Sequence, residues 1–249
     1  MKFYRKNRVT DVTTCGTFKM SMTRLTCMRH LIERVLEMEK MEEGPSIRDS
    51  SIEDREASDA ELRALLESLQ PRIRVYGVGG AGCNAVSRLF SEKLFENQFV
   101  TGYAINTDAQ ALLTSPIEQK ILIGRTARGR GAGGDPTKGE AAALESENIL
   151  KKITDDTQLA IITAGMGGGS GTGAAGQIAR LAKDQGALTI AVVTYPFNSE
   201  GNLRRQNAEW GLERLREHCD TILVIPNERL LEIEGVRDLP LASAFRVGD

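Results

Sequence analysis

The residues best suited to chemistry are glycines that gather in three short segments. Seventeen of the 25 glycines in this 249-residue chain fall within residues 77–82, 124–139 and 165–176. Where several residues lack a Cβ, successive backbone N–H groups can converge on an anion, and a following helix adds the positive end of its dipole. Glycine clusters between apolar segments therefore predict loops whose backbone binds phosphate groups.

The first and third segments suggest different ligands. Gly77–Gly82 has the spacing G-x-G-x-x-G, and Asp108 follows at the end of the next predicted strand, which is the arrangement of a dinucleotide site. Gly165–Gly173 is a second, larger cradle, in which Ser170 and Thr172 offer hydroxyl donors. A dinucleotide does not need a second cradle, whereas a nucleoside triphosphate does. The sequence favours the triphosphate and keeps an NAD site as an alternative.

A conventional P-loop is excluded. No glycine in the chain is followed directly by lysine, so G-x-x-x-x-G-K-[ST] cannot be placed. The charge of a bound phosphate must then be met by amides, helix dipoles, hydroxyl groups and Mg²⁺.

Alternating strands and helices are needed to position these loops. Apolar runs predict six strands, at Ile73–Val78, Thr101–Ile105, Lys120–Ile123, Leu159–Thr163, Leu188–Thr194 and Thr221–Ile225. Apolar residues at helical spacing follow the first strand, the second glycine segment and the third glycine segment, and they occur again from Ala208. After the second glycine segment they predict one long helix over Ala141–Ile153. We expect an α/β fold with a doubly wound, mostly parallel sheet and helices on both faces, which binds ligands at the carboxyl ends of its strands.

Composition excludes several classes of protein. Hydrophobic content of 41% and charged content of 27% are ordinary for a globular protein, and no apolar run is long enough for direct membrane insertion. The chain has no apolar segment typical of a secretory signal. Four dispersed cysteines and two histidines argue against a zinc site or a disulfide framework and favour a reduced cytoplasmic compartment. No basic face is indicated, so we expect no nucleic-acid partner.

The first 70 residues differ from the rest in charge. Residues 1–41 carry a net charge of +5, residues 42–70 carry −6, and the remainder carries −1. Residues 1–57 are expected to be a disordered extension or to reflect an early start codon, with a partner or membrane-surface role for Arg24–Lys40 as the alternative. Ser58 and Glu61 fit a capping box, so residues 58–70 are predicted to form a helix that docks on the body.

The rest of the chain resembles the tubulin superfamily, and FtsZ, the prokaryotic cell-division GTPase, in particular. Six motifs occur in family order within Arg72–Asp249, namely Gly77–Asn84, Ile105–Leu112, Gly131–Pro136, Gly165–Ala175, Val192–Gly201 and Ile225–Leu230. The residues Ala244–Asp249 look more like archaeal members than bacterial ones. The resemblance implies that residues 71–249 are a GTP-binding domain that binds GTP or GDP with Mg²⁺.

The resemblance also implies roles for individual residues. The phosphates and the neighbouring base edge would be contacted by Gly80, Ala81, Gly82, Cys83, Asn84, Ala132, Gly133, Gly171, Thr172 and Gly173, of which Ala132 and Gly133 face the γ-phosphate. The ribose, phosphate and guanine contacts would come from Glu200, Arg204, Asn227, Phe245 and Asp249. Two alternatives stay open: Glu200 and Arg204 as a surface ion pair, and Asn227 as a helix N-cap. Arg130 and Ser170 stand where the family usually has leucine and threonine.

In the family, the chain continues beyond the position of Asp249 with an acidic loop and a C-terminal activation domain. That loop completes the site of the next subunit in a head-to-tail protofilament. The resemblance therefore implies a self-associating GTPase that works in the cytoplasm at the division site with membrane-tethering proteins. We expect these 249 residues to bind GTP, to contain no catalytic residue, and to hydrolyse GTP poorly. The alternatives are a non-hydrolysing scaffold or filament cap and, from Gly77–Gly82 and Asp108, an NAD-dependent dehydrogenase.

Overall fold

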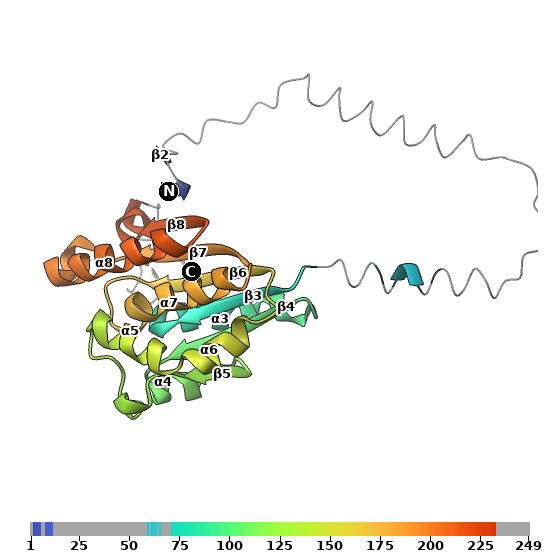
Figure 1. Ribbon diagram of the computed structural model, residues 1–249. Helices are drawn as coiled ribbons and strands as arrows, with labels where there is room; N and C mark the ends of the chain where they lie inside the picture. Colours follow the sequence, from blue (N-terminus) through green and yellow to red (C-terminus); the bar gives the residue numbers. More distant parts are fainter. Residues whose placement is uncertain are drawn as a thin grey trace, which may run out of the picture. The chain divides into compact units, whose positions relative to one another are not determined.

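A computed structural model describes residues 2–5, 8–11, 59, 61–63, 65 and 71–232 of the chain (Figure 1). The chain divides into one unit of Met1–Val12 with Pro71–Asp249 and a second of Thr13–Gln70. Most of the expected extension, together with Phe245 and Asp249, lies outside the described residues. Five residues of the expected 58–70 helix are described, and they are helical. Residues 2–5 and 8–11 of the extension form strands, which disorder does not allow; for the rest of the extension, and for the docking of that helix, the expectation stays a prediction.

The six strands expected from the sequence are confirmed and form the parallel part of one sheet. They are β3 (Ile73–Val78), β4 (Val100–Asn106), β5 (Gln119–Leu122), β6 (Leu159–Gly165), β7 (Leu188–Tyr195) and β8 (Thr221–Pro226). The order across the sheet is β8-β7-β6-β3-β4-β5, and every neighbouring pair is parallel. All six carboxyl ends therefore lie along one edge of the sheet.

Two further strands occur near the N-terminus, where the charge pattern predicts none. β1 (Lys2–Arg5) pairs antiparallel with β8, and β2 (Arg8–Asp11) pairs antiparallel with β1. The complete sheet thus has eight strands in the order β2-β1-β8-β7-β6-β3-β4-β5. The expected mostly parallel sheet is confirmed, with an antiparallel hairpin at the edge beyond β8.

Helices connect the parallel strands. The longer ones are α3 (Gly79–Ser91), α4 (Ala109–Thr114), α5 (Pro136–Glu145), α6 (Glu147–Thr154), α7 (Ser170–Asp184) and α8 (Asn202–His218). Short 3-10 helices are η1 (Leu94–Glu96), η2 (Arg125–Ala127), η3 (Asn198–Glu200) and η4 (Asn227–Glu232). The single long helix expected over Ala141–Ile153 is wrong, because the chain breaks between α5 and α6 at Ser146. The Ser146 hydroxyl accepts a hydrogen bond of 3.0 Å from the Gly124 N–H, which ties the break to the end of β5.

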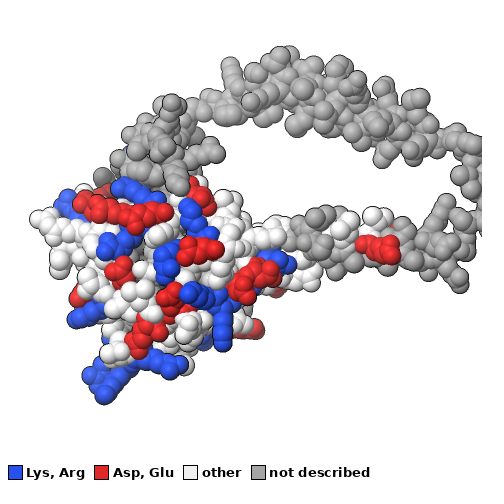
Figure 2. Space-filling view, in the orientation of Figure 1, with Lys and Arg blue, Asp and Glu red and all other residues white. Residues whose placement is uncertain are grey.

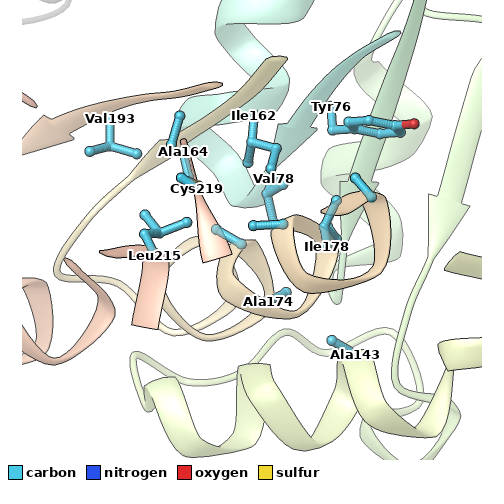
Figure 3. Packing of buried hydrophobic residues seen from close by; sticks show 14 of the residues in the cluster. Tyr76, Val78, Ala143, Ile162, Ala164, Ala174, Ile178, Val193, Leu215 and Cys219 are labelled. Carbon is cyan, nitrogen blue, oxygen red and sulfur yellow. The ribbon is translucent and has the colours of Figure 1, made fainter. Parts of the chain in front are cut away.

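The sheet is covered on both faces, as a doubly wound fold requires. One core cluster joins the face of β3 that carries Tyr76 and Val78 to α5, α6, α7 and α8, and the other joins Val75 on the opposite face to α3 and α4. In Figure 3, Ala174 and Ile178 of α7 lie between the sheet and Ala143 of α5. Small residues on α7 thus let it approach both neighbours closely, which fixes where its N-terminus lies.

The surface in view carries both charges. Figure 2 shows lysine and arginine side chains interspersed with aspartate and glutamate, as the near-neutral charge of this part of the chain predicts. Within the described residues no helix is long and apolar enough to cross a membrane.

Candidate phosphate-binding site

The first and third glycine segments meet at the centre of the sheet. β3 and β6 are neighbours, and α3 and α7 begin just beyond their carboxyl ends. Gly79 has a φ of +73°, and a Cβ on it would lie 2.6 Å from the Gly171 N atom. Only glycine fits this position, because a side chain would be strained by the left-handed backbone and would collide with the opposing loop. The two segments therefore form one continuous backbone surface.

The second glycine segment closes the same site from the side of α5. A Cβ on Gly169 would lie 2.8 Å from the Cβ of Ala132 and 3.0 Å from the Asp135 N atom. Gly131–Asp135 thus packs directly against the loop that precedes α7. The structure brings all three glycine segments together, as the parallel topology predicts.

One side of this surface is open. A Cβ placed on any of four glycines would meet no atom within 4 Å, and these are Gly80, Gly133, Gly134 and Gly168. All three segments contribute to this set. Their backbones therefore line a space that a ligand can enter, while the neighbouring glycines pack the loops against one another.

The N-termini of α3 and α7 supply the donors. N–H groups in the first turn of a helix have no partner within the helix, and neither helix has a side-chain cap or an acidic residue in its first turn. The amides of Gly171 and Thr172 lie in the first turn of α7. The Gly173 N–H donates to the Gly169 carbonyl at 2.9 Å, so this amide is already engaged. Two uncapped helix ends beside an open space are suited to bind an anion.

The two hydroxyl groups of the third segment are held by the protein. Thr172 is fully buried, and its Oγ1 accepts a hydrogen bond of 2.9 Å from the Gly167 N–H. The hydroxyls of Ser170 and Thr107 share a hydrogen bond of 2.6 Å. Thr107 is missed by the sequence reading, although it lies inside the quoted Ile105–Leu112 motif. These hydroxyls shape the loops in the structure, and their contact with phosphate stays a prediction.

The five site residues expected on α3 differ in their exposure to solvent. Gly80, Ala81 and Asn84 are exposed, while Gly82 and Cys83 are buried. The Cys83 thiol donates to the Gly77 and Ile105 carbonyls at 3.5 and 3.6 Å, and burial raises its pKa to about 11. The Cys83 side chain therefore belongs to the core, and any contact with a ligand would come from its backbone.

Glu200 and Arg204 form an ion pair beside the start of α8. Arg204 Nη1 and Glu200 Oε2 are 2.6 Å apart, and Glu200 Oε1 accepts a hydrogen bond of 2.8 Å from the Phe197 N–H. In the structure the two side chains therefore pair with each other, as the surface-pair alternative expects. The nucleotide roles expected for both residues stay predictions, since either group could exchange this partner for a ligand.

Asn227 is buried with an unused acceptor. The residue is 6% exposed, and its Oδ1 atom is buried with no hydrogen-bond partner among the described residues. Asn227 begins η4, and within the described residues this oxygen caps no N–H group. A buried carbonyl oxygen without a donor is costly, at about 1–3 kcal/mol. It is well suited to accept from an N–H group of a ligand.

A small cavity lies beside this end of the sheet. It has a volume of about 50 Å³ and is lined by Ala81, Ala85, Thr163, Ala164, Val192, Thr194 and Ile225. The cavity separates the exposed start of α3 from the carboxyl ends of β6, β7 and β8. Asn227 follows β8 directly in the chain but does not line this cavity.

Asp108 has a structural role. Its carboxylate accepts hydrogen bonds of 2.8 and 3.2 Å from the Gln110 and Ala111 N–H groups, and so caps α4. The dehydrogenase alternative uses Asp108 to hold a ribose, and in the structure its Oδ1 serves the start of α4 instead. Asp108 also forms an isolated bridge with the exposed residue Arg130.

Asp135 caps α5 in the same way. Its carboxylate accepts from the Thr137 hydroxyl and N–H at 2.7 and 3.0 Å, and these hydrogen bonds hold the pKa of Asp135 below its usual value. Among the described residues no group of three or more His, Cys, Asp or Glu side chains is arranged to hold a metal ion.

One residue at the site is missed entirely by the sequence reading. Asn207 on α8 donates from Nδ2 to the Gly134 and Gly167 carbonyls at 3.2 and 3.4 Å. Its partners are backbone oxygens 73 and 40 residues away in the chain, so no spacing in the sequence indicates the contact.

Comparison with known proteins identifies the architecture. The family described as Tubulin/FtsZ family, GTPase domain, matches residues 72–235. Cell division protein FtsZ 1 of Archaeoglobus fulgidus is 45% identical over 223 residues, which cover 89% of this chain and 58% of that protein. The chain thus spans a little over half the length of this relative.

Solved structures give the same result. An empty FtsZ dimer from M. jannaschii superposes with a TM-score of 0.70 at 47% identity, covering 77% of this chain and 55% of the other. CetZ2 from Haloferax volcanii, solved as a GTPγS-bound protofilament, superposes with a TM-score of 0.62 at 26% identity, covering 70% and 54%.

Proposed function

The chain belongs to the tubulin/FtsZ family, and on that premise we propose that it binds GTP and GDP at its three glycine segments. The observation that carries the proposal is the open backbone surface at the carboxyl ends of β3 and β6. There the uncapped starts of α3 and α7 lie beside Gly80, Gly133, Gly134 and Gly168, whose free faces leave room for phosphates.

The phosphate contacts follow the two helix ends and the loop between β5 and α5. Gly80–Asn84 pass beneath the phosphates, Gly171–Gly173 hold the α- and β-phosphates through the amides of Gly171 and Thr172, and Ala132 and Gly133 meet the γ-phosphate. Ala132 is buried and Gly133 exposed, so Gly133 offers the accessible amide. Because GDP lacks the third phosphate, the Gly131–Asp135 loop is the part of the site that distinguishes GTP from GDP.

The base and ribose contacts rest on fewer described residues. Asn227 and Asp249 read the guanine edge, Phe245 stacks on the ring, and Glu200 and Arg204 contact the ribose and a phosphate. The unused Oδ1 of Asn227 supports this assignment, since guanine presents N–H donors that adenine does not present in the same pattern. Mg²⁺ accompanies the nucleotide and is held mainly by phosphate oxygens and water, which needs no preformed cluster of carboxylates.

The relatives support a proposal for the role of the whole protein. We propose that it self-associates head to tail into protofilaments and acts in cell division, in the cytoplasm at the division site, with membrane-tethering partners. GTP is hydrolysed where subunits meet, because one subunit supplies the acids that position water on the nucleotide of the next. A polypeptide of these 249 residues alone is expected to bind GTP and to turn it over slowly.

Equilibrium titrations with GTP, GDP, ATP and NAD, each with Mg²⁺, test the proposal. GTP and GDP should compete for one site and bind at least about tenfold more tightly than ATP or NAD, since a wrong base leaves buried polar groups unpaired. Preferential binding of NAD would support a dehydrogenase instead. Release of phosphate at a rate typical of an assembled relative would contradict the expected slow turnover of this polypeptide.

A further inference from the structure

Asn207 joins two of the glycine segments to one helix. Its Nδ2 donates to the Gly134 carbonyl at 3.2 Å and to the Gly167 carbonyl at 3.4 Å. Gly134 belongs to the loop before α5, and Gly167 belongs to the loop before α7. A side-chain amide carries two N–H groups, so Asn207 can make both bonds at once.

The helix that carries Asn207 is itself firmly placed. A Cβ on Gly211 would lie 2.5 Å from Thr172 Cγ2, so α8 touches α7 with no space for a side chain between them. Arg214 Nε lies 3.0 Å from Glu140 Oε1, which joins α8 to α5, and the Arg214 guanidinium lies 3.4 Å from the centre of the Trp210 ring. Asn207 therefore connects the two loops to a fixed support.

The loop on the α5 side needs such a support. Gly133 and Gly134 are exposed, have φ values of +61° and +77°, and pack against no atom on their free side. The backbone of the loop is held at its start, where the Gly131 N–H donates to the Thr107 carbonyl, and by one bond from the Asp135 N–H to the Ala132 carbonyl, which closes a turn around Gly133 and Gly134. Among the described residues, Asn207 is the side chain that hydrogen-bonds the middle of the loop.

We propose that Asn207 is a positioning residue that holds the Gly131–Asp135 loop where its amides meet the terminal phosphate, and so sets the preference for GTP over GDP. This inference rests on the proposed function. Without the Asn207 amide, GTP must order the loop itself, which weakens its binding. GDP has no γ-phosphate and does not need the loop in that position. Loss of the two bonds should therefore lower affinity for GTP about five- to tenfold and change affinity for GDP less than about twofold.

The test compares GTPγS and GDP binding to three variants of the 249-residue chain. Asn207→Leu keeps the size of the side chain and removes both donors. Asn207→Asp places a carboxylate against two carbonyl oxygens, and should lower the GTPγS to GDP affinity ratio further. Gln206→Ala is the matched control, because it removes an exposed amide from the neighbouring position of α8 and should leave the ratio unchanged. If Asn207→Leu does not fold, as judged by thermal unfolding without nucleotide, Asn207→Ala gives the same comparison.

The outcomes separate this inference from the proposed function. An unchanged GTPγS to GDP ratio in Asn207→Leu, with a wild-type chain that binds both nucleotides, contradicts the role of Asn207 alone. An equal loss of affinity for both nucleotides also contradicts it, since that result means Asn207 supports the whole site and not the loop. A wild-type chain that binds neither nucleotide overturns the proposed function and this inference together.

Discussion

The helices α3, α4, α5 and α7 begin at the carboxyl edge of the sheet, and they start in two different ways. α4 and α5 begin with Asp108 and Asp135, whose carboxylates accept hydrogen bonds from the first-turn N–H groups. α3 and α7 begin with Gly79 and Ser170, with no side-chain cap and no acidic residue in the first turn.

The difference separates structural helix ends from ligand-binding ones. A capping carboxylate satisfies the first-turn donors and stabilises a helix by about 1 kcal/mol. The same carboxylate would occupy the donors that a phosphate needs and would repel its charge. Leaving α3 and α7 uncapped therefore costs stability in the free protein and creates the site. The comparison predicts that substitutions at the starts of α3 and α7 reduce nucleotide binding, whereas substitutions at the capped starts of α4 and α5 reduce stability and leave binding nearly unchanged.

The largest effect is expected where the two uncapped ends touch. Gly79→Ala places a Cβ 2.6 Å from the Gly171 N atom, so one of the two phosphate-binding loops must move. We expect affinity for GTP and GDP to fall about 100-fold, the equivalent of about 3 kcal/mol of overpacking. Titration with both nucleotides measures the loss.

Gly186→Ala is the matched control for this substitution. Gly186 has a φ of +86°, similar to the +73° of Gly79, but a Cβ there meets nothing within 4 Å. Both variants bear the backbone strain of about 1–2 kcal/mol, and only Gly79→Ala bears the collision. If both variants bind nucleotide as the wild type does, α3 and α7 do not form one site.

A medium effect is expected at Asn227, which begins η4 with its Oδ1 unused. Asn227→Ala removes a buried acceptor that has no partner, so the free energy of unfolding should change by less than about 1 kcal/mol. GTP affinity should fall about tenfold, because a guanine N–H loses its acceptor.

Asn106 is a buried asparagine whose acceptor oxygen, unlike that of Asn227, has a hydrogen-bond partner. It is 3% exposed, and its Oδ1 accepts from the Asp108 N–H at 3.3 Å. Asn106→Ala should lower the free energy of unfolding by about 1 kcal/mol, because it removes a bond that the folded protein makes. Chemical denaturation and GTP titration of both variants provide the test, and a stability loss in Asn227→Ala as large as in Asn106→Ala would count against an unused acceptor.

Much of the fold could be predicted from the sequence because its signals are local. The inner parallel strands are covered on both faces and read as near-continuous apolar runs, and the edge strand β5 is mostly exposed but ends in Ile121 and Leu122, so all six were found. The break at Ser146 could not be predicted, since it depends on a hydrogen bond from Gly124, which lies 22 residues away. The hairpin of β1 and β2 has no signal in a segment whose most evident property is its charge.

The site was predictable to a similar degree. Glycine clusters after strands indicate a phosphate cradle, and parallel topology brings them together. Asp108 was interpreted as a ribose ligand because an aspartate after a strand can hold a ribose; it can equally cap the next helix, and α4 has only six residues to indicate this. Asn207 was missed because it recognises backbone oxygens, whose positions depend on the fold and not on residue type.

The smallest effect is expected at the capped helix ends, and it concerns stability alone. Asp108→Ala removes the two hydrogen bonds that begin α4 and should lower the free energy of unfolding by about 1 kcal/mol, as for other lost N-caps. Affinity for GTP should change less than about twofold, because the proposed phosphate site uses the first turns of α3 and α7 and not that of α4. Asp108→Asn keeps an acceptor oxygen and should restore most of the stability. A fall in nucleotide affinity in Asp108→Ala that Asp108→Asn does not restore would mean that the carboxylate acts on the ligand, and the distinction between the two kinds of helix end would fail at α4.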